Sequence, residues 1–265
     1  MSKNGQRRST DPADYQRVPR AVAAMRKDFA SGFEILPHRH ERAQLIYATV
    51  GTMRISTSDG VWVVPPQRAL WMPTGVHHSI VMSGDVTMRT LYVRADAARG
   101  MPRACHVLPV SVLLRELITR ATELPVQYDE AGAAGHVVAL LLAELHIAGT
   151  LPLQLPMPRD PRLRKVCERL LAAPGDARTV DQWAVEANAS PRTIARLFTA
   201  ETGLTFGAWR QQARVLEAMG RLGSGAAVTD VAFDLGYDSV SAFSAMFRRA
   251  VGTSPRHYRP RLQSN

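Results

Sequence analysis

The chain has 265 residues, 46% of them hydrophobic, which is enough for one large or two ordinary domains and excludes an intrinsically disordered chain. No apolar run approaches the roughly 18 residues of a membrane-spanning helix, and the N-terminus lacks the apolar segment of a secretory signal. The two cysteines lie in different segments, which favours free thiols in a reducing compartment. We therefore expect a cytoplasmic protein that does not insert into a membrane.

The net charge of +10 is distributed unevenly along the chain. Residues 1–30 carry seven basic and three acidic side chains, and residues 31–158 carry ten of each. Residues 159–265 carry sixteen basic and ten acidic side chains. Basic ends around a neutral middle predict a polyanionic partner for the ends and a different task for the middle, but charge alone does not distinguish nucleic acid from a membrane surface.

The first 28 residues are predicted to form a mobile basic arm, and residues 29–108 a β-rich domain. This domain contains short apolar runs rich in β-branched and aromatic side chains, with glycine- and proline-containing turns between them. Many short strands at regular spacing are typical of a β-sandwich or a β-barrel. The predicted strands are Gln44–Thr49, Thr52–Thr57, Val61–Val64, Ala69–Met72, Ile80–Met82 and Val86–Val93.

Histidines within the β-rich domain follow a spacing that resembles the two sequence motifs of cupins, which are small β-barrels. In cupins the matching positions bind a metal ion, so the resemblance implies a cupin-like barrel with four of these side chains pointing into one pocket. The residues at the first motif spacing are Gly32, His38, His40, Gln44 and Gly51, and those at the second are Pro73, Gly75 and His78.

The predicted pocket of His38, His40, Gln44 and His78 has two interpretations. His38 and His40 are two positions apart on a predicted strand and therefore face the same side. Imidazole suits divalent iron, zinc, copper or nickel, so these four residues are candidate metal ligands. Alternatively, the same side chains hydrogen-bond an organic effector. Gln44 replaces the usual glutamate of the cupin motif, which removes the one anionic ligand and favours the organic effector.

Residues 109–150 change to helical spacing and are predicted to form a dimerisation segment. Two helices are expected, Val110–Ala121 and Asp129–Ala148. The second carries a long apolar stripe, and we expect it to pair two chains in a homodimer through Leu141 and Leu145. Residues 151–159 follow as a proline-rich linker, because three prolines in seven residues cannot continue a helix.

Residues 160–262 are predicted to be entirely helical and contain an internal repeat. Ser190 recurs 49 positions later as Ser239, and Asn188 recurs 48 positions later as Gly236. Serine is a favourable N-cap, and asparagine and glycine tolerate the left-handed conformation of a tight turn. Each copy is therefore predicted to be a helix-turn-helix, with a long helix over Thr205–Leu222 between the two copies.

The second helix of each copy is predicted to enter the major groove of duplex DNA. Arginine reads guanine there, and small side chains suit thymine methyl groups or close approach to phosphate. One such helix could equally be a solvated surface helix, but two in register favour DNA binding. The predicted contact residues are Arg192, Thr193 and Arg196 in the first copy, and Val240, Ser241, Ser244 and Ala245 in the second.

The segments 190–210 and 236–259 resemble the DNA-binding region of the AraC/XylS family. The resemblance covers about a hundred residues and implies two recognition helices in successive major grooves. The β-rich part is also similar to one subgroup of this family. The expected fold class is α+β multidomain, with an N-terminal cupin-like β-barrel, a helical dimerisation segment and a C-terminal all-α double helix-turn-helix. The expected function is sequence-specific transcription regulation under a small-molecule or metal effector, with duplex DNA and RNA polymerase as partners.

Two other functions are compatible with parts of this pattern. A metal-dependent cupin enzyme carrying a DNA-binding domain would use the histidines for catalysis. The glutamine at position 44 and the lack of a second acid–base cluster near the barrel argue against an enzyme, and no catalytic residue or obligatory cofactor is predicted. A purely architectural DNA-binding protein would not need a domain of sensor size.

Overall fold

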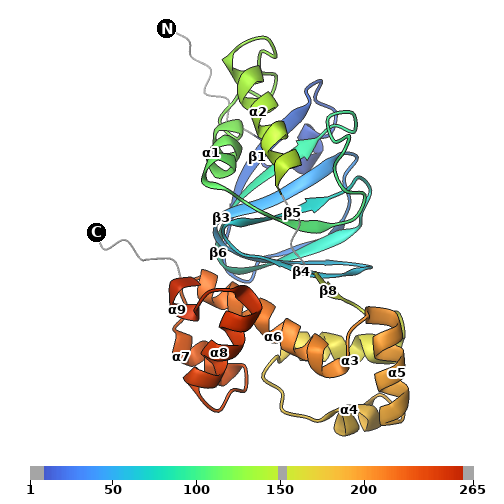
Figure 1. The fold of residues 1–265 in the computed structure, drawn as a ribbon. Helices are drawn as coiled ribbons and strands as arrows, with labels where there is room; N and C mark the ends of the chain where they lie inside the picture. The colour runs from blue at the N-terminus through green and yellow to red at the C-terminus, as the bar shows by residue number, and fades with distance from the viewer. Residues whose placement is uncertain (1–8, 149–153, 259–265) are drawn as a thin grey trace. The chain divides into compact units, whose positions relative to one another are not determined.

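A computed structural model describes residues 9–148 and 154–258 of the chain (Figure 1). The chain divides into two compact units, one formed by residues 1–53 and 64–152 and the other by residues 54–63 and 153–265. Strands dominate the first unit and helices the second, as expected for a cupin-like domain and a helical DNA-binding domain. No described helix has the length and hydropathy needed to cross a membrane.

The first unit is built on antiparallel strands. β6 lies between β1 and β3 in the sheet and also pairs with β2, whereas β5 pairs with β3 and β7. β1 pairs with β6 along its whole length, from Val22 opposite Val93 to Phe29 opposite Val86. The strands are β1 (Val22–Phe29), β2 (Glu34–His38), β3 (Ala43–Thr57), β4 (Gly60–Val64), β5 (Arg68–Met72), β6 (His78–Val93) and β7 (His106–Pro109). Residues 54–57 of β3 and 60–63 of β4 belong to the second unit.

Two pairs of predicted strands are in fact single long strands. β3 covers both runs predicted at 44–49 and 52–57, and β6 covers both runs predicted at 80–82 and 86–93. The glycines that indicated turns, Gly51 and Gly84, adopt φ values of 76° and 72° inside these strands. At Gly51 a Cβ atom would lie 2.3 Å from the carbonyl oxygen of Asp85, so this glycine permits close approach of two strands rather than a turn.

The predicted mobile arm over residues 1–28 is wrong for its C-terminal part. Residues Pro12–Tyr15 form the 3-10 helix η1, and β1 already begins at Val22. Four of the eight side chains in β1 are buried, so this segment belongs to the core although it also carries basic residues. Residues 1–8 lie outside the described residues.

Two helices complete the first unit and agree with the predicted helical segment. α1 (Val112–Ala121) begins at the N-cap Ser111, whose side chain accepts a hydrogen bond from the backbone N–H of Leu114. α2 (Ala133–Ile147) packs Leu141 and Leu145 into the same hydrophobic core as strands β3, β5 and β6. Both leucines are therefore core residues of one chain, and the predicted role for them in a contact between chains is wrong.

The second unit consists of two helix-turn-helix copies on either side of a long helix (Figure 1). Buried side chains from both copies and from the long helix form a single hydrophobic cluster. The helices are α3 (Pro161–Ala172), α4 (Val180–Glu186), α5 (Pro191–Thr202), α6 (Phe206–Gly223), α7 (Val228–Asp234), α8 (Val240–Val251) and α9 (Pro255–Tyr258). Residues 259–262, the end of the predicted domain, lie outside the described residues.

The turns and caps of the repeat agree with the sequence prediction. Ser190 and Ser239 are the N-caps of α5 and α8, and each side chain accepts a backbone N–H three residues ahead. Asn188 has φ of 49° and Gly236 has φ of 75°, so both turns use the left-handed conformation. These local signals place the two recognition helices at equivalent points of the two copies.

The predicted linker over residues 151–159 contains regular structure. β8 (Gln154–Pro156) pairs antiparallel with β4 in the second unit, with Val61 opposite Leu155. Trp209 of α6 donates its indole N–H to the carbonyl of Pro156, 2.7 Å away. Residues 151–153 of the predicted linker lie outside the described residues.

Candidate functional site

Three histidines predicted from the sequence converge at one point of the first unit. His38 ends β2, His78 begins β6 directly opposite it, and His40 follows in the loop after β2. One ligand nitrogen from each ring lies within 4.8 Å of the other two. The ring centroids are 4.2 Å apart for His38 and His78, 4.8 Å for His38 and His40, and 5.5 Å for His40 and His78. His40 and His78 are buried.

Backbone carbonyls fix which nitrogen of two of these rings carries the proton. Nδ1 of His38 lies 2.8 Å from the carbonyl oxygen of Leu36, and Nδ1 of His78 lies 3.0 Å from that of Val76. A carbonyl oxygen can only accept, so Nδ1–H donates in both rings and Nε2 keeps its lone pair. Nε2 of His40 and of His78 is buried and has no hydrogen-bond partner within the described residues.

Burial keeps two of the three imidazoles neutral. Burial, together with the neighbouring His38 and His78, lowers the pKa of His40 from 6.5 to about 4. The pKa of His78 is also lowered to about 4, mainly by burial, while its hydrogen bond to Val76 opposes that shift. At neutral pH both rings therefore offer lone pairs, which is the protonation state that a metal ligand requires.

Gln44, the fourth predicted residue, is buried on β3 and held by β6. Its Nε2 donates to the hydroxyl of Thr90, 3.0 Å away, and that hydroxyl donates to the carbonyl of Leu45. The amide oxygen of Gln44 is left without a hydrogen-bond partner among the described residues. Thr90 precedes Tyr92 by two positions, and the Tyr92 ring packs against His40 with centroids 5.0 Å apart.

The segment before β1 is anchored beside the histidines by Arg42, which the sequence analysis did not identify. Arg42 is buried and donates to the backbone carbonyls of Gln16, Val18 and Arg20, among others. A buried guanidinium must find acceptors, but nothing in the sequence around Arg42 indicated that this side chain would be buried.

The first recognition helix presents the predicted arginines to solvent. Arg192 and Arg196, one turn apart on α5, are exposed, whereas Ile194 and Phe198 on the opposite side are fully buried. Thr193 is half-buried, and its hydroxyl lies 2.9 Å from that of the N-cap Ser190. The helix therefore separates a core face from a face that could contact DNA.

The second recognition helix exposes smaller side chains. Ser241 and Ala245 are exposed on α8, Ser244 is half-buried, and Val240 packs partly against the hydrophobic core. The last turn adds two exposed arginines, Arg248 and Arg249, which the sequence analysis passed over. Two adjacent basic residues at the end of a recognition helix were the signal for a further phosphate contact.

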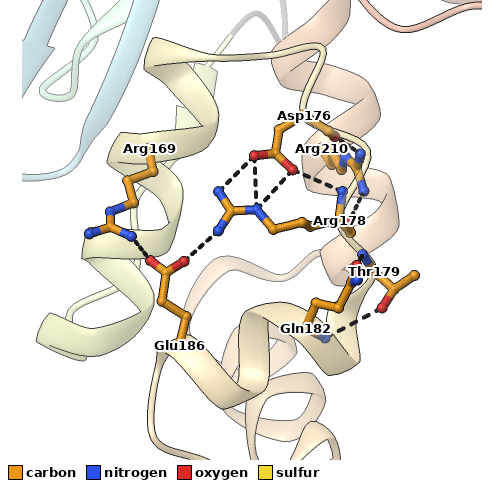
Figure 2. Close-up of polar contacts among 7 residues, drawn as sticks. All are labelled: Arg169, Asp176, Arg178, Thr179, Gln182, Glu186 and Arg210. Carbon is orange, nitrogen blue, oxygen red and sulfur yellow. Dashed lines mark hydrogen bonds and ion pairs between the residues drawn. The ribbon is translucent and has the colours of Figure 1, made fainter.

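An ion-pair network lies among α3, α4 and the loop between them in the first copy (Figure 2). Arg178 donates to the carboxylate of Asp176 and to that of Glu186, which also pairs with Arg169 of α3. Hydrogen bonds from Arg178 lower the pKa of the Asp176 carboxyl, which stays ionised at neutral pH. The network ties α3, α4 and the loop between them together.

Comparison with known proteins places both parts of the chain. A family model described as an AraC-like ligand binding domain matches residues 30–182, and one described as a helix-turn-helix domain matches residues 183–261. The chain is 36% identical over 226 residues to the HTH-type transcriptional regulator NimR of Escherichia coli K12, covering 85% of this chain and 82% of that protein.

Two further relatives are less similar, one in the share of the chain that aligns and the other in sequence identity and TM-score. The HTH-type transcriptional activator RhaR of Escherichia coli K12 is 29% identical over 126 residues, which is 47% of this chain and 44% of RhaR. The crystal structure of ToxT from Vibrio cholerae O395 aligns with 90% of this chain and 96% of its own, at a TM-score of 0.39 and 10% identity. NimR and RhaR are transcription regulators by name, so the enzyme alternative is set aside. The chain belongs to the AraC family of transcription regulators, with an AraC-like ligand-binding domain followed by a helix-turn-helix DNA-binding domain.

Proposed function

We propose that this regulator binds its DNA site with α5 and α8 in successive major grooves and that an effector at His38, His40 and His78 changes that binding. The observation that carries the effector proposal is the convergence of three imidazoles, two of which, His40 and His78, have a buried Nε2 without a hydrogen-bond partner among the described residues. Such buried acceptors are costly unless a bound species satisfies them. The pocket is therefore better suited to a ligand than to a purely structural role.

DNA recognition is assigned to the exposed faces of the two recognition helices. Arg192 and Arg196 are suited to guanine, and Thr193 is suited to a phosphate or a base edge. On α8 the small side chains permit close approach of the helix to the groove. The α8 residues proposed to lie at the DNA are Val240, Ser241, Ser244 and Ala245.

We propose a divalent transition-metal ion as the effector in the pocket. The ring centroids of the three histidines are 4.2 to 5.5 Å apart, a separation that suits one ion between the nitrogens rather than an organic molecule. Zinc binds imidazole nitrogen at about 2.0–2.1 Å, so the nitrogens need only small shifts to bind one ion. Gln44 would supply a neutral oxygen at most, which is a weaker donor than the glutamate of cupins.

The carbonyls of Leu36 and Val76 support a metal for a second reason. Histidine ligands of metals regularly donate their other ring N–H to a backbone carbonyl or carboxylate, which fixes the ring and makes the free nitrogen more basic. His38 and His78 both have this arrangement. An organic effector remains the second candidate, favoured by the neutral Gln44, and it would have to donate protons to the same nitrogens.

A metal assay distinguishes the two effector classes. The purified full-length protein is analysed for bound metal and then melted with Zn²⁺ alone and with a chelator. A resident ion should be present at one per chain, and saturating Zn²⁺ at about 100 Kd should stabilise the fold by about 2.7 kcal/mol. His78→Ala should abolish this stabilisation, and His77→Ala, at an exposed neighbour, should preserve it. Absence of metal together with an unmoved melting temperature would assign the pocket to an organic effector.

We further propose that two copies of the chain associate through α1 and α2. These helices pack against each other and expose four large apolar side chains, Val112, Leu113, Leu140 and Ile147. Clustered exposed apolar residues are typical of association surfaces, and a second copy offers the same surface for a symmetric contact.

As a transcription regulator the protein is expected to act in the cytoplasm and to contact RNA polymerase at its promoters.

A further inference from the structure

The loop between α3 and α4, residues 173–179, touches the turn of the second helix-turn-helix copy. A Cβ atom on Gly175 would lie 2.1 Å from the carbonyl oxygen of Asp234, the last residue of α7. A Cβ atom on Gly236 would lie 2.8 Å from the carbonyl oxygen of Gly175. Neither backbone can carry a side chain here, so the two copies meet at a direct backbone contact.

Two arginines of α6 hold this loop from the other side. Arg210 donates to the carbonyls of Asp176 and Arg178, the latter at 2.8 Å. One turn further along α6, Nε of Arg214 donates to the carbonyl of Pro174 at 2.9 Å. Helix α6 therefore holds the loop at three backbone carbonyls, those of Pro174, Asp176 and Arg178. Hydrogen bonds from a charged guanidinium are stronger than those between neutral groups.

Arg214 also reaches the second copy. Its guanidinium lies 5.6 Å from the centre of the Tyr237 ring, over the residue that follows Gly236. Arg214 therefore contacts the loop of the first copy and the turn of the second with one side chain. A cation over an aromatic ring adds attraction to this contact.

The loop is itself rigidly attached to α4 (Figure 2). Arg178 donates to Asp176 through Nε at 2.9 Å and through its terminal nitrogen at 2.6 Å. The same guanidinium lies 3.6 Å from the centre of the Trp183 ring and pairs with Glu186. Because Trp183 and Glu186 are residues of α4, the loop cannot shift without moving the helix that precedes recognition helix α5.

We infer that residues 173–178 form a brace that fixes the position of α5 relative to α8 and so sets the spacing between the two DNA sites that the protein accepts. Without the brace the two copies would be joined mainly along α6. With it, the loop before α4 and the turn after α7 are held to one another through Gly175, Gly236 and Arg214. This inference rests on the proposed use of both recognition helices.

DNA geometry makes the spacing measurable. One inserted base pair moves the second groove by about 3.4 Å along the axis and turns it by about 34° around the axis. If α5 and α8 are held rigidly, one of them loses its contacts with DNA after that change. If the two helices can move relative to one another, both keep their contacts. The ratio of affinities for the original and the lengthened site therefore reports how firmly the two copies are held.

The test compares full-length variants on one set of duplexes. A high-affinity site is selected from a random-sequence duplex library, and one base pair is added or removed between the two contacted grooves. The native protein should lose affinity about tenfold or more with either change, the size of one or two mismatches. Gly175→Ala should reduce this loss to about threefold. Gly207→Ala is the matched control, because a Cβ atom there meets nothing within 4 Å, and it should keep the native ratio.

Arg214→Gln provides a second, independent variant that adds no atoms to the backbone contact. It removes the charged contact to Pro174 and Tyr237. It should therefore also reduce the loss of affinity caused by the added or removed base pair. Circular dichroism and melting curves identify the variants that fold, and if Gly175→Ala does not fold, Arg214→Gln decides alone. A folded variant that keeps the native ratio would overturn the brace. A native protein indifferent to the inserted base pair would instead overturn the use of two grooves and the brace with it.

Discussion

His38 at the end of β2 lies directly opposite His78 at the start of β6, with their ring centroids 4.2 Å apart. Each ring donates Nδ1–H to a carbonyl two residues before it in the chain. The same local hydrogen bond therefore orients Nε2 of both rings. His40, in the loop after β2, completes the set without belonging to either strand.

The substitution His40→Ala should remove the response to the effector and preserve DNA binding. His40 belongs to the first compact unit, whereas α5 and α8 belong to the second. The affinity of the metal-free protein for its DNA site should stay within about 0.5 kcal/mol of the native value, as expected for positions that share no contacts. Fluorescence anisotropy with labelled duplex, with and without Zn²⁺, measures both quantities.

His77→Ala is the control for this experiment, because His77 is exposed and adjacent to the pocket residue His78. It should respond to Zn²⁺ as the native protein does. Retention of the full Zn²⁺ response by His40→Ala would show that the effector binds elsewhere.

Arg196→Ala should weaken binding to the specific DNA site by roughly 1–3 kcal/mol and relax the preference at one or two base pairs. Arg196 is exposed one turn beyond Arg192 on the first recognition helix, where a guanidinium can read guanine. Binding-site selection with the variant identifies the relaxed positions. Arg248→Ala serves for comparison and should weaken binding to all sequences alike. An equal loss on all sequences for Arg196→Ala would make it a phosphate contact.

Asn188 tests the left-handed turn of the first copy. Its φ of 49° is unfavourable for most side chains, and asparagine tolerates it better than alanine does. Asn188→Ala should lower the free energy of unfolding by about 1 kcal/mol, whereas Asn188→Gly should leave it unchanged or raise it slightly. Urea denaturation of the two variants measures the difference. Equal stability of the alanine and glycine variants would mean that the turn relaxes to another conformation.

The features that the sequence predicted well are those with local causes. The N-caps Ser190 and Ser239 and the turn residues Asn188 and Gly236 each act within a few residues, and their recurrence located both recognition helices. The convergence of the three histidines was expected from the resemblance to the two cupin motifs, because His38 and His78 lie on different strands and no local pattern brings them together.

Features that depend on distant partners were missed. The basic residues of 22–29 suggested a solvated arm, but this segment pairs with β6 along its whole length and half of its side chains are buried. The glycine contact between Gly175 and Gly236 joins segments far apart in sequence, and neither glycine alone indicates a partner. The side chain of Arg42 finds its acceptors in the segment before β1, which no pattern near Arg42 specifies.

The proposed contact of α2 with a second chain can be tested by choosing between adjacent leucines. Leu140 is 46% exposed and Ile147 77% exposed, whereas Leu141 is fully buried in the core of its own unit. The double change Leu140→Glu and Ile147→Glu should give a folded monomer, because two charges on the exposed face oppose burial between chains. Analytical ultracentrifugation measures the mass, and melting curves show that the fold is intact.

Leu141→Glu is the informative contrast, because it places a carboxylate inside the hydrophobic core. It should lower the melting temperature strongly whatever the state of association, since an unpaired buried charge is among the most destabilising changes. We expect Leu141→Glu to lose both its fold and its dimers, and the double variant to lose its dimers alone. That result would assign Leu141 to the core of one chain, and Leu140 and Ile147 to the contact between chains. If the native protein is monomeric at micromolar concentration, or if the double variant keeps the native mass, the contact between chains does not use this face of α2.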